Sequence, residues 1–229
     1  MLNKAGEAKA ADKQNSDVAT FTFDLQQILT CPKLQAGCSY YKSKLNVHNL
    51  TFYNLTNRDG YCFTWHQGEC SQGANEVTSC IVKLLDCLDK QGKRPVILYR
   101  NKCCGQNRNS VVGSAIIHFL SRSKSVQQVE QKYFESGHSQ MECDSMHSAI
   151  ETTFQQQEID LPSDYQLCMQ MARPAKPYLV QEINHTDIMD FKQFNAFLAA
   201  SAFSGIIKAH HITYTKTDGD PIVSMATVT

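Results

Sequence analysis

The chain has 229 residues, and its 22 Lys and Arg residues balance 22 Asp and Glu residues to a formal net charge of zero. This neutrality argues against a stand-alone nucleic-acid-binding domain, which is usually basic, but it is compatible with a catalytic domain whose acidic site masks basic patches. The chain is 42% hydrophobic, as expected for a globular core, and it has neither a signal-type apolar segment nor an apolar run of membrane-spanning length. We therefore expect an intracellular protein without a membrane partner.

The ten cysteines are scattered through apparent strands and helices. Without an export signal, this distribution favours buried free thiols in a reducing compartment over disulfides. A zinc site remains an alternative, since some of these thiols could converge with two histidines. The residues concerned are Cys103, Cys104, Cys143, His138 and His147. Because no Cys-x-x-Cys pair occurs, we expect no zinc.

The N-terminal part begins with residues 1–17, which have no apolar stripe and indicate a disordered lead-in or a frayed helix. Residues 18–24 then alternate phenylalanine with threonine, which predicts a strand with Asp24 at its end. Strand ends are where α/β folds build their sites, although Asp24 could equally cap the following turn. Lys42 and Lys44, in a loop or short helix with two tyrosines, could hold a phosphate backbone or form a solvated edge.

Two antiparallel strands, a helix and a further strand should follow. Residues 45–55 and 61–65 are the expected strands, because the Asp-Gly pair between them favours a hairpin. Apolar residues at helical spacing predict a helix over 77–88, with Glu76 in its first turn, where a carboxylate suits the helix dipole. Residues 96–99 predict a strand buried on both faces, which ends near Asn101.

A polar loop with Gln106, Asn107 and Arg108 leads into the next predicted helix. Its glycine spacing matches no nucleotide-binding fingerprint. Arg108 could steady a substrate phosphate or simply cap the helix. Residues 126–135 favour a weaker strand.

The stretch that follows is the most informative of the chain. Ser139 and Glu142 have capping-box spacing, which predicts a helix that begins near Gln140. One side of this helix should be an apolar, buried stripe. Beside it, Asp144, His147 and Glu151 recur at helical spacing and should form an acidic stripe. Clustered carboxylates suit a hard divalent cation, although a solvated polar face with a satisfied histidine is the alternative interpretation.

The remaining residues, 161–229, predict a C-terminal extension of helices and strands. A helix is expected over 162–171, a short strand at 178–180, a helix over 187–200, and two closing strands at 206–215 and 222–228. This tail could be a small α+β appendage or an extension of the main sheet. The predicted organisation is thus a lead-in at 1–17, a core at 18–160 and an extension at 161–229.

The order of these elements resembles the ribonuclease H-like α/β fold of ribonucleases H, integrases and DDE transposases, a mixed sheet flanked by helices. Several motifs together also resemble an uncharacterised, transposon-associated invertebrate family with a transposase-like core, over roughly Val18 to Glu182. The motifs are FDLQQ at 23–27, YYKSKLNV at 40–47, GANE at 73–76, CGQNRN at 104–109 and GHSQMECDSMH at 137–147.

The resemblance implies a metal-dependent phosphodiester-cleaving or strand-transfer core with Mg²⁺ or Mn²⁺ as cofactor and DNA as the main partner. It also implies a nuclear location and a DNA-targeting module on an upstream segment. Asp24, Asp144 and Glu151 would be metal ligands. The catalytic set would comprise Asp24, Glu76, Asn101, His138, Asp144 and Glu151. The substrate-binding set would comprise Lys42, Lys44, Gln106, Asn107, Arg108 and His147.

One departure from the pattern concerns activity. Such proteins commonly have an aspartate where this chain has Asn101, followed by Lys102. A neutral amide is a weaker metal ligand than a carboxylate, so we expect a weakened or inactive catalytic domain. The competing hypothesis is a domesticated binding or scaffold protein that keeps only the fold. A histidine-dependent 3′–5′ exonuclease with His138 as base is a further alternative, but Gln26 occupies the place of its second acid.

Overall fold

The computed structural model describes residues 4–15, 17–33, 43–92, 95–101, 110–134, 141–155, 157–193, 209–217 and 222–226. The chain divides into two compact units that are each assembled from separate stretches of sequence. The first unit consists of Met1–Thr22, Gly73–Ser139 and Met189–Thr229, and the second consists of Phe23–Gln72 and Gln140–Ile188. Strand β1 (Ala19–Leu25) contributes its beginning to the first unit and its end to the second.

The first unit contains a mixed sheet. Its strand order is β1, β5 (Pro95–Asn101), β6 (Gln128–Phe134), β8 (His211–Thr215) and β9 (Ile222–Ala226). The first three run parallel, and the last two are added antiparallel. Residues 96–99 are at most 5% exposed, which confirms the predicted strand buried on both faces.

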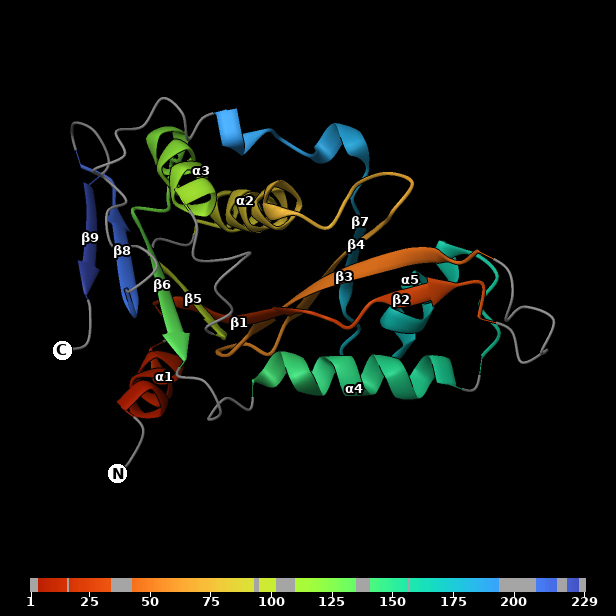
Figure 1. The fold of residues 1–229 in the computed structure, drawn as a ribbon. Helices are drawn as coiled ribbons and strands as arrows, with labels where there is room; N and C mark the ends of the chain where they lie inside the picture. Colours follow the sequence, from red (N-terminus) through yellow and green to blue (C-terminus); the bar gives the residue numbers. More distant parts are fainter. Residues whose placement is uncertain are drawn as a thin grey trace. The chain divides into compact units, whose positions relative to one another are not determined.

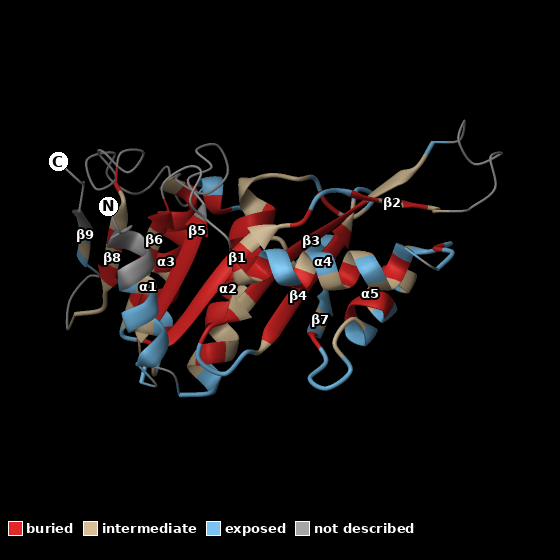
Figure 2. Ribbon diagram, turned by 90° about the horizontal axis from the view of Figure 1, so that it is seen from below, coloured by how far each residue is buried: buried red, intermediate tan, exposed pale blue. Residues whose placement is uncertain are grey.

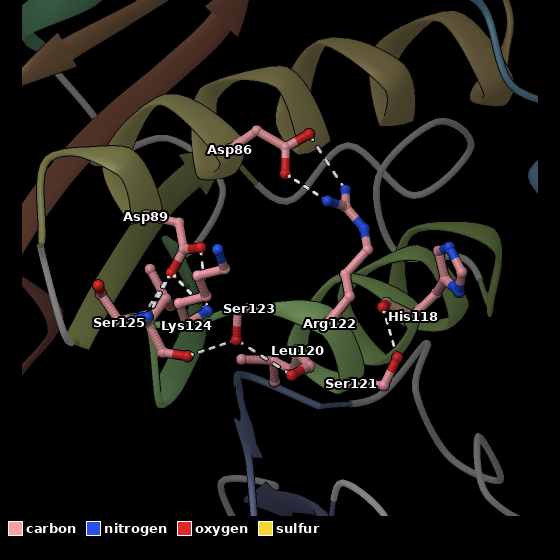
Figure 3. Close-up of polar contacts among 10 residues, drawn as sticks. Asp86, Asp89, His118, Leu120, Ser121, Arg122, Ser123, Lys124 and Ser125 are labelled. Atoms are coloured by element: carbon pink, nitrogen blue, oxygen red, sulfur yellow. Dashed lines mark hydrogen bonds and ion pairs between the residues drawn. The ribbon is translucent and has the colours of Figure 1, made fainter.

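Helices α2 (Ala74–Lys90) and α3 (Ser110–Arg122) pack against each other in this unit (Figure 1). Two carboxylates of α2 fix the end of α3, as Figure 3 shows. Asp86 forms an ion pair of 2.8 Å with Arg122. The Asp89 carboxylate accepts backbone N–H bonds from Lys124, Ser125 and Val126 at 2.6–3.1 Å, and so satisfies donors just beyond the helix end.

Residues 8–14 of helix α1 (Lys4–Gln14) are mostly exposed, as Figure 2 shows, and the helix is tied to this sheet through Asp12. Its carboxylate lies 2.7 Å from the Lys132 ammonium and accepts from the Tyr99 hydroxyl at 2.5 Å. Thr20 on β1 also donates to the Asp12 carbonyl. The threonine side of β1 is buried as well as the phenylalanine side: Thr20 and Thr22 are both 0% exposed.

The second unit has its own set of paired strands. β3 (Leu45–Asn54) pairs antiparallel with β4 (Gly60–His66) and with β2 (Leu29–Cys31), and β7 (Leu179–Glu182) runs parallel to β4. Helices α4 (Glu142–Gln155) and α5 (Pro162–Met171) pack on these strands, and a short 3₁₀ turn covers His185–Asp187. The hairpin turn places Gly60 against Tyr178, where a Cβ would lie only 2.6 Å from the ring.

Most predicted elements are present, with some corrections. A loop or short helix was expected over residues 25–41, but the structure has the short strand β2 there. Of the helix expected over 187–200, residues 191–193 are helical and residues 188–190 are not. Residue 187 ends the 3₁₀ turn, and residues 194–200 lie outside the described ranges. The C-terminal strands do not form a separate appendage, because β7 extends the pairing of β4 and β8 extends that of β6.

The fold is therefore mixed α/β, as predicted. Parallel β1, β5 and β6, together with the antiparallel β3–β4 pair, are compatible with a ribonuclease H-like fold. The cysteines within the described ranges are free, and all except Cys87 are buried, as expected. In the part of the chain that the structure describes, no helix is long and apolar enough to cross a bilayer.

Candidate functional site

Helix α4 carries the residues on which the predicted site depends. Its apolar stripe is confirmed: Cys143, Met146, Ile150 and Phe154 are all buried, and the last three belong to the core of the second unit. Asp144, His147 and Glu151 lie beside this stripe, as the helical spacing predicted. The buried stripe fixes how α4 is rotated and thereby fixes the position of the polar row.

The N-terminus of α4 differs from the prediction. The helix begins at Glu142 rather than near Gln140, and Ser139 lies outside the described residues. The side chain that satisfies the backbone here is Asp144, whose Oδ2 accepts from the Met141 N–H at 2.9 Å. This is the reciprocal half of a capping box with Asp144, not Glu142, in the third helical position. Asp144 is thus held in place by the helix terminus itself.

His147 is bound to β3 by a short hydrogen bond. Its Nε2 lies 2.7 Å from Thr51 Oγ1, and the Thr51 hydroxyl donates to the Asp24 carbonyl at 3.1 Å. Because the Thr51 hydroxyl uses its only hydrogen in the bond to the Asp24 carbonyl, its oxygen must accept a hydrogen bond from His147 Nε2–H. In the neutral imidazole the basic nitrogen is then Nδ1. Stacking of Phe23 on Phe52, with centroids 5.0 Å apart, holds the end of β1 beside β3 at this point.

Three carboxylates act electrostatically on His147. Burial is the largest effect and lowers the pKa of the imidazole, while the negative charges of Asp24, Asp144 and Glu151 raise it. Burial prevails, and the pKa falls below its ordinary value of 6.5. Near neutral pH the imidazole is therefore uncharged and can accept a proton. The structure thus places three predicted carboxylates, Asp24 at the end of β1 and Asp144 and Glu151 on α4, close enough to His147 to act on its charge.

A buried amide chain orients the carboxylate farthest along the helix. Gln26 Nε2 donates to Glu151 Oε1 at 3.3 Å, and Gln26 Oε1 accepts from Asn49 Nδ2 at 2.9 Å. Gln26 is only 2% exposed and Asn49 only 1%. Gln26 therefore holds Glu151 in place. From the sequence, this residue was evidence only against an exonuclease.

Sequence reasoning did not identify Thr51 and Asn49 as part of this site. Both are polar residues inside β3, whose residues 47–52 are all buried. A polar side chain in a buried strand needs a hydrogen-bond partner, and that requirement was the available signal. The site therefore has a polar floor made by β3.

The other predicted site residues lie elsewhere or are not described. Glu76 is 8% exposed in the first turn of α2, and Asn101 is the last residue of β5; both belong to the first unit. Lys44 is half-buried just before β3 in the second unit. Five predicted residues lie outside the described ranges: Lys42, Gln106, Asn107, Arg108 and His138.

The donor set does not fit a ready-made metal centre. Within the ranges that the structure describes, no three His, Cys, Asp or Glu side chains are grouped so that they could hold a metal ion. Each of the three carboxylates around His147 has one oxygen in a protein hydrogen bond, with Leu25 N–H, Met141 N–H and Gln26 as the donors. The chemistry of this site is therefore best derived from its protein groups.

The sequence matches the family described as "Domain of unknown function (DUF7869)" over residues 39–227. The chain belongs to this family. The DUF7869 segment includes Thr51, Asp144, His147 and Glu151, whereas Asp24 precedes it. No curated protein and no solved structure matches the chain.

Proposed function

We propose that this chain is a transposase-derived, ribonuclease H-like core that binds nucleic acid, with DNA as its main partner, and whose metal-dependent phosphodiester cleavage is weak or lost. The observation that carries this proposal is the hydrogen-bonded path from His147 on α4 through Thr51 to the Asp24 carbonyl, with the charges of Asp24, Asp144 and Glu151 all acting on the imidazole. This path supports the proposal because it joins the end of β1 to helix α4. A nuclear location and an upstream DNA-targeting module belong to the same proposal.

Two observations argue for weakened rather than full activity. Asn101, and not an acid, ends β5. The described carboxylates are engaged in protein hydrogen bonds and do not form a metal-binding group. A two-metal reaction needs several anionic oxygens directed at the same ions.

The protein groups themselves suit proton transfer. Neutral His147 would take a proton on Nδ1 from an attacking water or hydroxyl, and the three carboxylates would stabilise the resulting imidazolium. Thr51 fixes the ring through Nε2, and Gln26 fixes Glu151. Residual hydrolysis should therefore depend on His147. Its rate should decrease as the pH is lowered, because the imidazole becomes protonated.

A second candidate is a scaffold that keeps the fold without chemistry, and the neutral Asn101 and the absence of a metal group among the described residues favour it. The two candidates differ in metal binding. Calorimetry with Mg²⁺ and Mn²⁺ should be run on the native chain, Asn101→Asp and Asp144→Ala, with the exposed Glu158→Ala as control. The transposase-derived core predicts weak binding that Asn101→Asp strengthens and Asp144→Ala abolishes.

If neither the native chain nor Asn101→Asp binds metal, the carboxylates do not converge on an ion. The scaffold is then the better description. If Glu158→Ala weakens binding as much as Asp144→Ala, the effect is one of total charge, and the site loses its support.

A further inference from the structure

A pocket of ≈ 350 Å³ lies in the second unit, directly beside the His147 site. Its volume is within the range of about 300–1,000 Å³ in which small-molecule sites occur. It is lined by Gln27, Ile28, Leu29, Thr30, Lys33, Glu151, Phe154, Gln155 and Tyr165. Glu151 belongs to both places, so a molecule in the pocket would touch a carboxylate that acts on His147.

One wall of the pocket is apolar and rigid. Phe154 meets the edge of the Tyr165 ring with centroids 5.2 Å apart, and the Tyr165 hydroxyl donates to the Thr30 carbonyl at 2.9 Å. Ile28 is 42% exposed, so it offers an apolar surface to a molecule that enters. Together with the Phe154 and Tyr165 side chains, it gives the pocket an apolar side that suits a planar ring.

The polar groups of the pocket have opposite charges. Lys33 Nζ donates to the Phe154 carbonyl at 3.1 Å and lies 4.5 Å from the centre of the Phe154 ring. An ammonium has three N–H donors, so further donors can reach an anion such as a phosphate. Glu151 accepts from Gln26 through one oxygen, and a carboxylate has capacity for additional donors such as an amino group.

A ligand that matches these features carries an anionic group, a planar ring and an amino group. We infer that the pocket binds one unpaired nucleotide of a DNA strand, with its phosphate at Lys33 and the amino group of its base at Glu151. This inference rests on the proposed function and specifies its substrate: a strand end or distorted duplex with an unpaired nucleotide, rather than continuous duplex.

The test compares two fluorescent DNA probes by anisotropy without metal, so that binding is measured apart from cleavage. One probe is a blunt duplex, and the other ends in a single unpaired dA. We expect the overhang to bind about tenfold more tightly, in line with the contribution of a single stacked base. An unpaired dT, which lacks an amino group, should gain less than dA, and a matching RNA end tests whether the sugar matters.

Two variants locate the effect. Lys33→Met keeps the aliphatic stem and removes the ammonium, and Ile28→Asp puts a negative charge on the exposed rim without altering the core. Both should bring the affinities for the overhang and for the blunt duplex to the same value. Lys192→Met, at an exposed lysine of the first unit, is the matched control and should change neither.

The possible failures are distinguishable. If both probes bind equally, or if the preference survives in Lys33→Met and Ile28→Asp, the pocket inference is wrong while DNA binding stands. If neither DNA probe binds at any tested concentration, the proposed function and the pocket inference both fail. If only the RNA end binds in the pocket, the inference is wrong in its choice of DNA.

Discussion

The Thr51 hydroxyl offers the sharpest test of the site geometry, because it joins His147 on α4 to the Asp24 carbonyl at the end of β1. Thr51→Val replaces the hydroxyl with a methyl group of similar size. The change removes the hydrogen bonds that this hydroxyl makes with the Asp24 carbonyl and with His147 Nε2, at 3.1 and 2.7 Å. A buried group left without a partner costs about 1–3 kcal/mol. Because His147 is half-buried and water can reach it, we expect a total loss of about 2 kcal/mol.

Urea denaturation followed by tryptophan fluorescence would measure this loss. Trp65 is the only tryptophan of the chain, it is 1% exposed, and it lies in the same unit as Thr51. Thr51→Ser is the control, since it keeps the hydroxyl and loses only a buried methyl group, at a cost of about 1 kcal/mol. If Thr51→Val is as stable as the native chain, or more stable than Thr51→Ser, the hydroxyl does not bridge these elements and the derived tautomer of His147 loses its basis.

Three further outcomes are expected. Burial lowers the folded-state pKa of His147 below 6.5, so just below that pH the unfolded chain binds more protons than the folded chain, and stability should fall as the pH drops from 6.5. His147→Gln should flatten that part of the curve of stability against pH. An unchanged curve in this variant would contradict the lowered pKa of His147. Gly60→Ala should lower the unfolding free energy by about 1–3 kcal/mol, because the new Cβ would lie 2.6 Å from the Tyr178 ring, and native-like urea stability would show that the ring moves aside. Asp89→Ala should cost about 1–2 kcal/mol by removing the acceptor of three backbone N–H groups, whereas Asp89→Asn should recover part of it; equal melting temperatures for both variants and the native chain would refute this role.

Periodicity was sufficient where one physical requirement dominates a segment. The stripe of Cys143, Met146, Ile150 and Phe154 predicted both a helix and its buried side, and this placed Asp144, His147 and Glu151 correctly on the margin. Local pattern was insufficient at the start of α4. The capping box was predicted for Ser139 and Glu142, but Asp144 is the residue whose carboxylate accepts a backbone N–H there. Local capping patterns are short, and several can occur within one turn.

Contacts between elements decide what periodicity leaves open. The alternation of Phe and Thr predicted the strand β1 but not its surroundings: Thr20 donates to the Asp12 carbonyl of α1, and Thr20 and Thr22 are both buried. Thr51 and Asn49 are separated from α4 by about a hundred residues of sequence, and no local pattern connects them with it. Their roles depend on which strands become neighbours.

The sequence by itself determined the α/β class, the order of helices and strands, and the polar row of α4, because hydrophobic periodicity and turn residues act locally. That Asn101 departs from an acidic metal site stays a prediction of the resemblance. Only the tertiary structure decided that Thr51 fixes His147, that Gln26 holds Glu151, and that a pocket opens beside them. These features depend on long-range strand pairing and on burial, which set hydrogen-bond partners and the direction of pKa shifts and which no short stretch of sequence contains.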